Sequence, residues 1–147
     1  MSFDVSASGL EAQRIRLDVL ANNIANAQTT RTADGGPYRR RGVVFEAVGG
    51  TRQPFFRMLD EARRGEALGQ GVKVAKIIEQ QGDDAFTEVF DPTHPDADEQ
   101  GIVRLPNIKV SNEIVNLIDA QRAYEANITA MNATKQIAAK TLEIGRT

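Results

Sequence analysis

The residues best able to do chemistry lie in Asp91–Gly101, DPTHPDADEQG, which holds the single histidine of the chain, His94. Four carboxylates accompany it: Asp91, Asp96, Asp98 and Glu99. Such a set could bind a hard divalent cation, and His94 with Asp96 could serve a metal-dependent hydrolase. The spacing is not that of an EF-hand loop, because the glycine of its sixth position is missing. Two prolines stiffen the segment, so we expect a structural or interface turn, with adventitious cation binding as the alternative.

Other catalytic chemistry finds little support in the sequence. The chain has no cysteine, which excludes disulfides, thiol catalysis and cysteine zinc sites. A catalytic triad built on His94 would need a placed nucleophile and an orienting carboxylate. The sequence also contains no glycine-rich phosphate-binding loop. We therefore predict no enzyme activity, no cofactor and no dedicated metal site.

The net charge and the hydropathy of the chain argue against further classes of protein. The net charge of −2 argues against a nucleic-acid-binding protein, which normally carries a basic excess. The short basic run Tyr38–Arg41 is expected to be a solvated turn, with a polyanion site as the alternative. No apolar run is long enough to span a bilayer, and no secretory signal is visible. The protein is expected to be cytoplasmic, or exported without a cleaved signal.

Two long helices are predicted at the ends of the chain. Near the N-terminus, apolar residues recur every seven positions, at Phe3, Leu10, Leu17 and Ile24, and Leu20 and Ala27 stand three positions after the last two of them. This pattern predicts a helix over about 5–27, with Ser6 or Ser8 as its N-cap. Near the C-terminus a stripe alternates at spacings of three and four: Ile114, Leu117, Gln121, Tyr124, Ile128, Met131, Lys135, Ala138 and Leu142.

The C-terminal helix has clear predicted ends. Ser111 is the expected N-cap, and Glu113 lies in the first turn, where the helix dipole favours an anion. Gly145 follows the last periodic residue and is the expected stop.

The middle of the chain is rich in glycine and proline and predicts short strands over 43–48, 72–78, 85–90 and 102–105, with a short helix over 54–64. The fold class is therefore α+β. We expect residues 1–30 and 111–147 to form a coiled-coil domain, with a β-rich module over 31–110 inserted between its helices. That module is too small to cover both apolar stripes, so the helices must pair with each other or with other subunits.

Three asparagines, Asn22, Asn23 and Asn26, stand near the end of the first helix although asparagine is a poor helix former. At 100° per residue they point roughly 130° away from the apolar stripe. One interpretation is a frayed helix end. The other is a second, uncharged contact face, where Ala21 and Ala25 allow another helix to approach.

Four segments carry a family resemblance: LANNIANAQTT (20–30), PYRRRGVVFE (37–46), FDPTHPDADEQGIVRLPNI (90–108) and EIVNLIDAQRAYEANITAMNATKQI (113–137). The first resembles the motif shared by bacterial flagellar rod and hook proteins. Together they resemble the proximal rod proteins of the FlgC type. The residues that make the third segment specific are Asp91, Pro92, His94, Pro95, Gly101, Pro106 and Asn107. Ile102 departs from the family, which usually has tyrosine there.

The resemblance implies a structural subunit of the flagellar basal-body rod. It implies export through the flagellar type III apparatus without signal cleavage, and helical assembly into a periplasmic shaft that transmits torque. Implied partners are copies of itself, other rod proteins and the FliE-type basal-body protein, with no nucleic acid and no membrane insertion.

The resemblance also assigns the terminal helices to a coiled-coil, D0-like domain. The expected assembly stripe is Leu10, Leu17, Leu20, Ile24, Ile114, Leu117, Tyr124, Ile128, Met131 and Leu142. Gln121 and Lys135 interrupt it and could specify register. The alternatives are another rod or hook protein of the same family, or a coiled-coil adaptor outside the flagellum.

Overall fold

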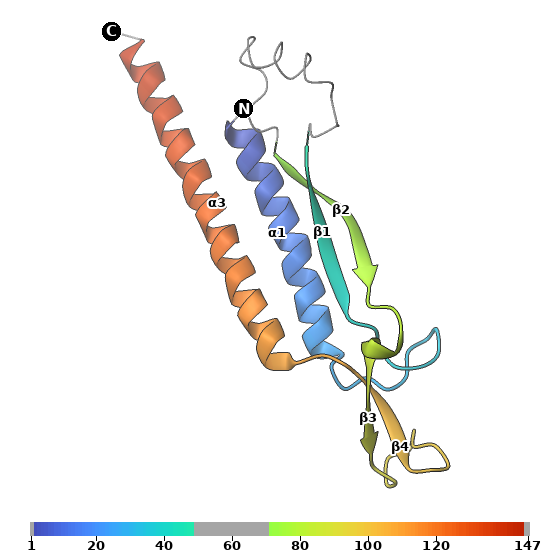
Figure 1. Ribbon diagram of the computed structural model, residues 1–147. Helices are drawn as coiled ribbons and strands as arrows, with labels where there is room; N and C mark the ends of the chain where they lie inside the picture. Colours follow the sequence, from blue (N-terminus) through green and yellow to red (C-terminus); the bar gives the residue numbers. More distant parts are fainter. Residues whose placement is uncertain (1, 49–70, 146–147) are drawn as a thin grey trace, which may run out of the picture. The chain divides into compact units, whose positions relative to one another are not determined.

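The computed structural model describes residues 2–48 and 71–145 (Figure 1). Along the chain lie α1 (Ser2–Ala25), β1 (Arg41–Ala47), β2 (Val72–Glu79), the 3-10 helix η1 (Asp83–Ala85), β3 (Phe86–Phe90), β4 (Ile102–Pro106) and α3 (Val110–Ile144). The predicted α+β class is confirmed, with long helices flanking a module of antiparallel strands. All four predicted strands are present within two residues of their expected limits. The predicted helix over 54–64 lies outside the described residues.

The predicted caps of the helices are mostly wrong. Because α1 already begins at Ser2, both Ser6 and Ser8 lie inside it. The Ser8 hydroxyl donates to the carbonyl of Val5 (2.7 Å) and accepts the main-chain N–H of Val72 (3.1 Å), so it joins α1 to the start of β2. Ser111 is likewise the second residue of α3.

The C-terminal stop is confirmed. Helix α3 ends at Ile144, directly before Gly145. The N–H of Gly145 donates to the carbonyl of Thr141 at 3.1 Å, which satisfies one of the last carbonyls of the helix.

The strands form two separate two-stranded sheets. Strand β1 pairs with β2, and the flanking bonds from Val48 N–H to Gly71 O and from Gln80 N–H to Arg40 O give an antiparallel pair. Strands β3 and β4 are antiparallel, from Phe86 opposite Pro106 to Phe90 opposite Ile102. Each sheet has few strands, so it depends on helices and loops for burial.

The chain divides into two compact units, and each unit draws on both helices. The first comprises Met1–Ile15, Val44–Ala75 and Gln121–Thr147, and the second comprises Arg16–Val43 and Lys76–Ala120. In the first unit Gly9 of α1 lies against the side chain of Asn127 of α3. Because glycine has no side chain, the two helices can approach closely at this point.

Within the part of the chain that the structure describes, no helix is long and apolar enough to cross a membrane.

Candidate assembly interface

The stripe predicted on α1 is only partly buried. Leu20 is 6% exposed, whereas Leu10, Leu17 and Ile24 are half-buried. Small residues occupy much of the remaining buried face of this helix: Ser6, Gly9 and Ala12. Hydrophobic periodicity gives little weight to such residues, although they permit the closest contact between elements.

On α3 the buried positions are shifted by one residue from the predicted stripe. Ala120 is fully buried, whereas its neighbour Gln121 is exposed. Leu117, Tyr124 and Met131 are half-buried, as a helix seam requires. Three other stripe residues are exposed: Ile114 (45%), Ile128 (38%) and Leu142 (71%). The exposed Gln121 and Lys135 therefore do not interrupt the intramolecular seam, because they lie outside it.

The three asparagines at the end of α1 have different surroundings, and Asn26 directly follows Ala25, the last residue of the helix. The exposed Asn22 donates its amide to the carbonyl of Asp18 (2.9 Å), and Asn26 donates to the carbonyl of Asn22 (2.9 Å). Both amide nitrogens therefore bond to main-chain carbonyls of α1, and Oδ1 of Asn26 also accepts the hydroxyl of Thr29 (3.1 Å). Asn23 is 0% exposed and is the largest fully buried side chain among the described residues.

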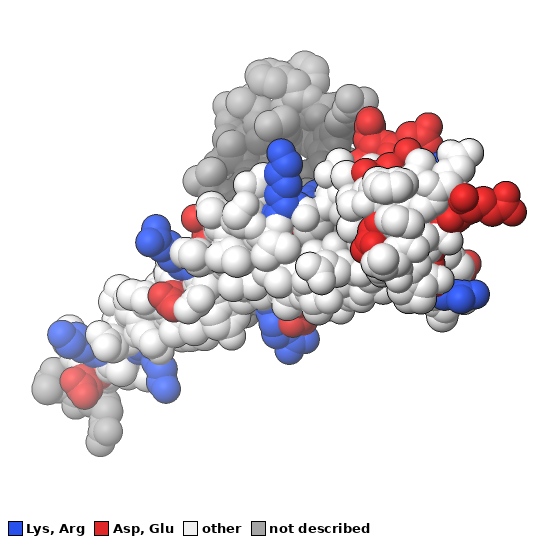
Figure 2. Space-filling model, turned by 90° about the horizontal axis from the view of Figure 1, so that it is seen from below, with Lys and Arg blue, Asp and Glu red and all other residues white. Residues whose placement is uncertain are grey.

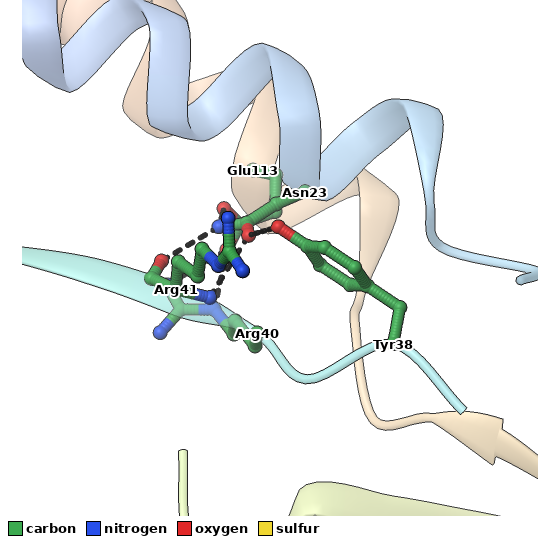
Figure 3. Close-up of polar contacts among 5 residues, drawn as sticks. All are labelled: Asn23, Tyr38, Arg40, Arg41 and Glu113. Carbon is green, nitrogen blue, oxygen red and sulfur yellow. Dashed lines mark hydrogen bonds and ion pairs between the residues drawn. The ribbon is translucent and has the colours of Figure 1, made fainter. Parts of the chain in front are cut away.

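Asn23 makes every hydrogen bond that its side chain offers (Figure 3). Its amide nitrogen donates to the carbonyl of Arg41 (2.8 Å) and to Oε2 of Glu113 (3.0 Å). Its amide oxygen accepts the N–H of Arg41 (2.9 Å) and the hydroxyl of Tyr38 (3.1 Å). Two donors and two acceptor sites are the full capacity of asparagine, so the buried amide is completely satisfied.

An ion pair between the buried Glu113 and the partly exposed Arg40 completes this cluster. Glu113 is 2% exposed, and its Oε1 accepts from Nε (2.8 Å) and Nη2 (2.7 Å) of Arg40. A buried carboxylate is costly unless it is paired and hydrogen-bonded, and here both conditions hold. Glu113 does lie in the first turn of α3, as predicted, but its main contacts are with Arg40 and Asn23.

Tyr38 closes one side of the cluster. Its ring is buried, and the guanidinium of Arg41 lies 5.7 Å from the ring centroid. Burial raises the pKa of the Tyr38 phenol, the Arg41 cation lowers it, and the Glu79 and Glu113 carboxylates raise it, with a net increase. The phenol is therefore held protonated and donates to Asn23.

The prediction of a solvated basic turn at Tyr38–Arg41 is wrong. Arg39 lies over the ring of Phe86, 4.9 Å from its centroid, and Arg40 pairs with Glu113. Arg41 pairs with Glu79 at 2.8 Å. Every arginine of the run thus has a partner within the second unit.

The loop between β3 and β4 is held by its own acidic side chains. Asp91 Oδ1 accepts the hydroxyl (2.7 Å) and the N–H (3.1 Å) of Thr93, and these bonds lower the pKa of the Asp91 carboxyl. Asp98 accepts the N–H groups of Gln100 (2.9 Å) and Ile102 (2.8 Å). These carboxylates act as turn-forming groups.

The other residues of this motif also have structural positions. His94 Nδ1 accepts the N–H of Asp96 (3.1 Å), and Asp96 Oδ2 accepts the hydroxyl of Thr30 (2.7 Å). Gly101 has φ +77°, and a Cβ there would meet Pro92 and Phe90 at about 3.0 Å. Pro106 is buried, Pro95 is exposed, and Asn107 bonds to the carbonyl groups of Asp84 and Ala85.

Acidic side chains nevertheless gather on the surface of the β3–β4 hairpin (Figure 2). In the described ranges no three histidine or carboxylate side chains are close enough to hold a metal ion together.

Comparison with known proteins decides which family this arrangement belongs to. Residues 3–31 match the model described as flagella basal body rod protein. Residues 99–144 match the model described as flagellar basal body rod FlgEFG protein, C-terminal. The flagellar basal-body rod protein FlgC of Bacillus subtilis is 45% identical over 150 residues, covering 99% of this chain and 97% of the relative.

The chain belongs to the FlgC family of flagellar basal-body rod proteins.

FlgC proteins of other bacteria are similar to this chain over nearly the same length. That of Borreliella burgdorferi is 41% identical, covering 97% of this chain and 95% of the relative. That of Salmonella typhimurium is also 41% identical, covering 98% and 96%. The resemblance inferred from the sequence motifs is thereby confirmed.

The polar cluster links the two segments of this FlgC-family chain that match rod-protein models. Asn23 lies in the first matched segment and Glu113 in the second, whereas Tyr38, Arg40 and Arg41 lie between them. Sequence reasoning named Asn23 and Glu113 separately but did not join them. Their adjacency had no local signal, because they are 90 residues apart.

Proposed function

We propose that this FlgC-family chain polymerises through α1 and α3 with copies of itself and with other rod subunits, forming a periplasm-crossing shaft that transmits torque. In this proposal residues 1–30 and 111–147 form the assembly domain, and residues 31–110 form an inserted module. The chain acts as a structural protein and not as an enzyme. It reaches the rod through the type III export apparatus without signal cleavage, and it contacts the FliE-type protein there.

One observation carries this proposal: α3 exposes large apolar side chains in the single chain. Ile114, Ile118 and Ile128 are 45%, 43% and 38% exposed, and Ile137 and Leu142 are more exposed still. Isolated exposed apolar residues are normal, but this number on one helix is typical of a surface that other chains cover. Asn22 of α1 and Asn26, which directly follows the end of α1, remain candidates for a second, uncharged contact.

A charge placed on that surface tests the proposal. Ile128→Asp changes a side chain that is 38% exposed, so the free energy of unfolding of the isolated chain should fall by no more than about 1 to 2 kcal/mol. In cells whose only source of this protein is the variant, we expect loss of motility and of isolable rods. The matched control is Thr129→Asp, which adds the same charge to the neighbouring exposed position and should preserve rods.

Intact rods with Ile128→Asp would contradict the proposed assembly surface. The hydrolase alternative is tested separately with His94→Ala, which should leave motility unchanged if the loop is only structural. Recovery of the chain in a particle other than the basal body would favour the adaptor alternative.

A further inference from the structure

The first unit contains a hollow that is lined by side chains of α1 and α3. It has a volume of about 300 Å3 and is lined by Leu10, Glu11, Arg14 and Tyr124. That volume would hold about ten waters at roughly 30 Å3 each, so it can accept a large aliphatic side chain. Among the described residues, its lining combines the half-buried side chains of Leu10 on α1 and Tyr124 on α3 with two exposed charges on α1.

The hollow has two charged side chains at its rim, Glu11 and Arg14. Among the described residues, neither Glu11 nor Arg14 has a side-chain hydrogen bond or ion pair. The rim therefore offers one negative and one positive group beside an apolar floor. An incoming helix that carries an apolar residue next to a lysine would be oriented by this rim, with the lysine toward Glu11 and away from Arg14.

Helix α3 carries a side chain pattern of this kind in the same unit. Ile137 is 67% exposed, and Lys140, three residues later, is exposed on the same side of the helix. Exposed alanines at 130 and 133 precede Ile137 at helical spacing and would let another helix approach. This face thus presents one apolar knob with a cation beside it.

Ile137 cannot fill the hollow of its own chain. It lies thirteen residues beyond Tyr124 on the same helix, which is about 20 Å at a rise of 1.5 Å per residue. A second copy has no such restriction.

We propose that Ile137 of one copy inserts into the hollow of Leu10 and Tyr124 of the next, with Lys140 placed beside Glu11. The contact is a knob entering a hole between two helices, as in coiled coils. It is head-to-tail, because the donating and accepting surfaces differ, and it can therefore propagate along a polymer. The inference rests on the proposed polymerisation and specifies one contact within it.

Cross-linking tests this contact directly, because a chain without cysteine makes each introduced thiol unique. Chains carrying Leu10→Cys and size-tagged chains carrying Ile137→Cys are produced together as the only source of this protein. Basal bodies are isolated, treated with a mild oxidant and separated without reductant. We expect a mixed disulfide that requires both variants.

The matched control replaces Ile137→Cys by Ala139→Cys, an exposed position two residues along that faces the other side of α3. We expect much less mixed disulfide from this pair, because a disulfide forms only where the two Cβ atoms lie close and point toward each other. Rods that assemble but give no more 10–137 disulfide than the control would overturn this contact while leaving polymerisation standing. Failure of the unaltered, tagged chain to enter basal bodies would instead overturn the proposed function.

A charge exchange provides the second test. Glu11→Lys and Lys140→Glu change exposed side chains, and each should reduce rod yield about threefold or more. The double variant restores an opposite pair at the proposed contact and should recover rods. A double variant no better than the weaker single variant would overturn the proposal.

Discussion

The side-chain amide of Asn23 pairs with both main-chain groups of Arg41, accepting its N–H at 2.9 Å and donating to its carbonyl at 2.8 Å. An amide side chain on a helix thus bonds to the first residue of β1 as a neighbouring strand would. The same amide donates to Glu113 at the start of α3. One residue therefore joins three elements of the second unit.

Replacing Asn23 should be costly. Asn23→Ala leaves the hydroxyl of Tyr38, the main-chain groups of Arg41 and one oxygen of Glu113 without this partner in a buried site. We expect a loss of about 2 to 4 kcal/mol in the free energy of unfolding, measured by chemical denaturation.

Asn22→Ala is the matched control, because Asn22 is exposed and bonds only to the carbonyl of Asp18. It should change stability by no more than about 0.5 kcal/mol. Equal effects of the two substitutions would show that the buried amide does not anchor the second unit.

Arg40 and Glu113 should behave as a coupled pair. Arg40→Ala leaves a buried carboxylate unpaired, which is expected to cost about 3 kcal/mol, whereas Arg40→Ala with Glu113→Gln removes that charge as well. The double variant should therefore be more stable than the sum of the single effects by about 1 to 3 kcal/mol. A double-mutant cycle by denaturant titration measures this coupling, and strict additivity would contradict it.

Stability should fall at alkaline pH because of Tyr38. Its pKa in the folded chain is raised above the ordinary value of about 10, so the unfolded chain loses the phenol proton first. The stabilisation is fully present below about pH 10 and is lost as the pH rises through the folded pKa.

Tyr38→Phe should remove this alkaline loss and cost about 1 kcal/mol at neutral pH through the missing hydrogen bond. Unfolding curves between pH 8 and 11.5 check both effects. Ultraviolet absorbance of the tyrosinate in Tyr124→Phe chains isolates the titration of Tyr38. A normal Tyr38 titration there would refute the burial effect.

Gly71→Ala should destabilise the first unit in two ways. Gly71 has φ +105°, which is strained for alanine, and a Cβ there would collide with the hydroxyl of Ser8. Gly35 has φ +85° with no atom near its Cβ position, so Gly35→Ala reports the backbone strain alone. We expect about 1 to 3 kcal/mol for the control and a larger loss for Gly71→Ala, measured by thermal unfolding.

The elements of this fold were predictable because each has a local signal. Turn residues separate the strands, and the long helices lack proline and, in α3, glycine. The packing was less predictable because three buried positions of the helices are Gly9, Ala12 and Ala120, whose small side chains contribute little to a hydrophobic pattern. This explains why the buried side of α3 lies one position from the apolar stripe.

The polar cluster could not be predicted from local patterns. A charged or amide side chain is normally assigned to the surface, and only the three-dimensional pairing of Arg40 with Glu113 makes burial acceptable. The turns of the loop at Asp91–Gly101 were easier to predict, because aspartates next to proline and glycine favour turns wherever they occur.

The hydrogen bond from Asn23 to Glu113 closes a loop of 90 residues. Contacts between residues so far apart in sequence slow folding, because the chain must lose the entropy of the whole loop before the bond contributes. The second unit therefore cannot complete its interior until the start of α3 has joined the end of α1. A fragment that stops before Glu113 would lack the acceptor for one N–H of the Asn23 amide, so it could not form the complete polar cluster of the second unit.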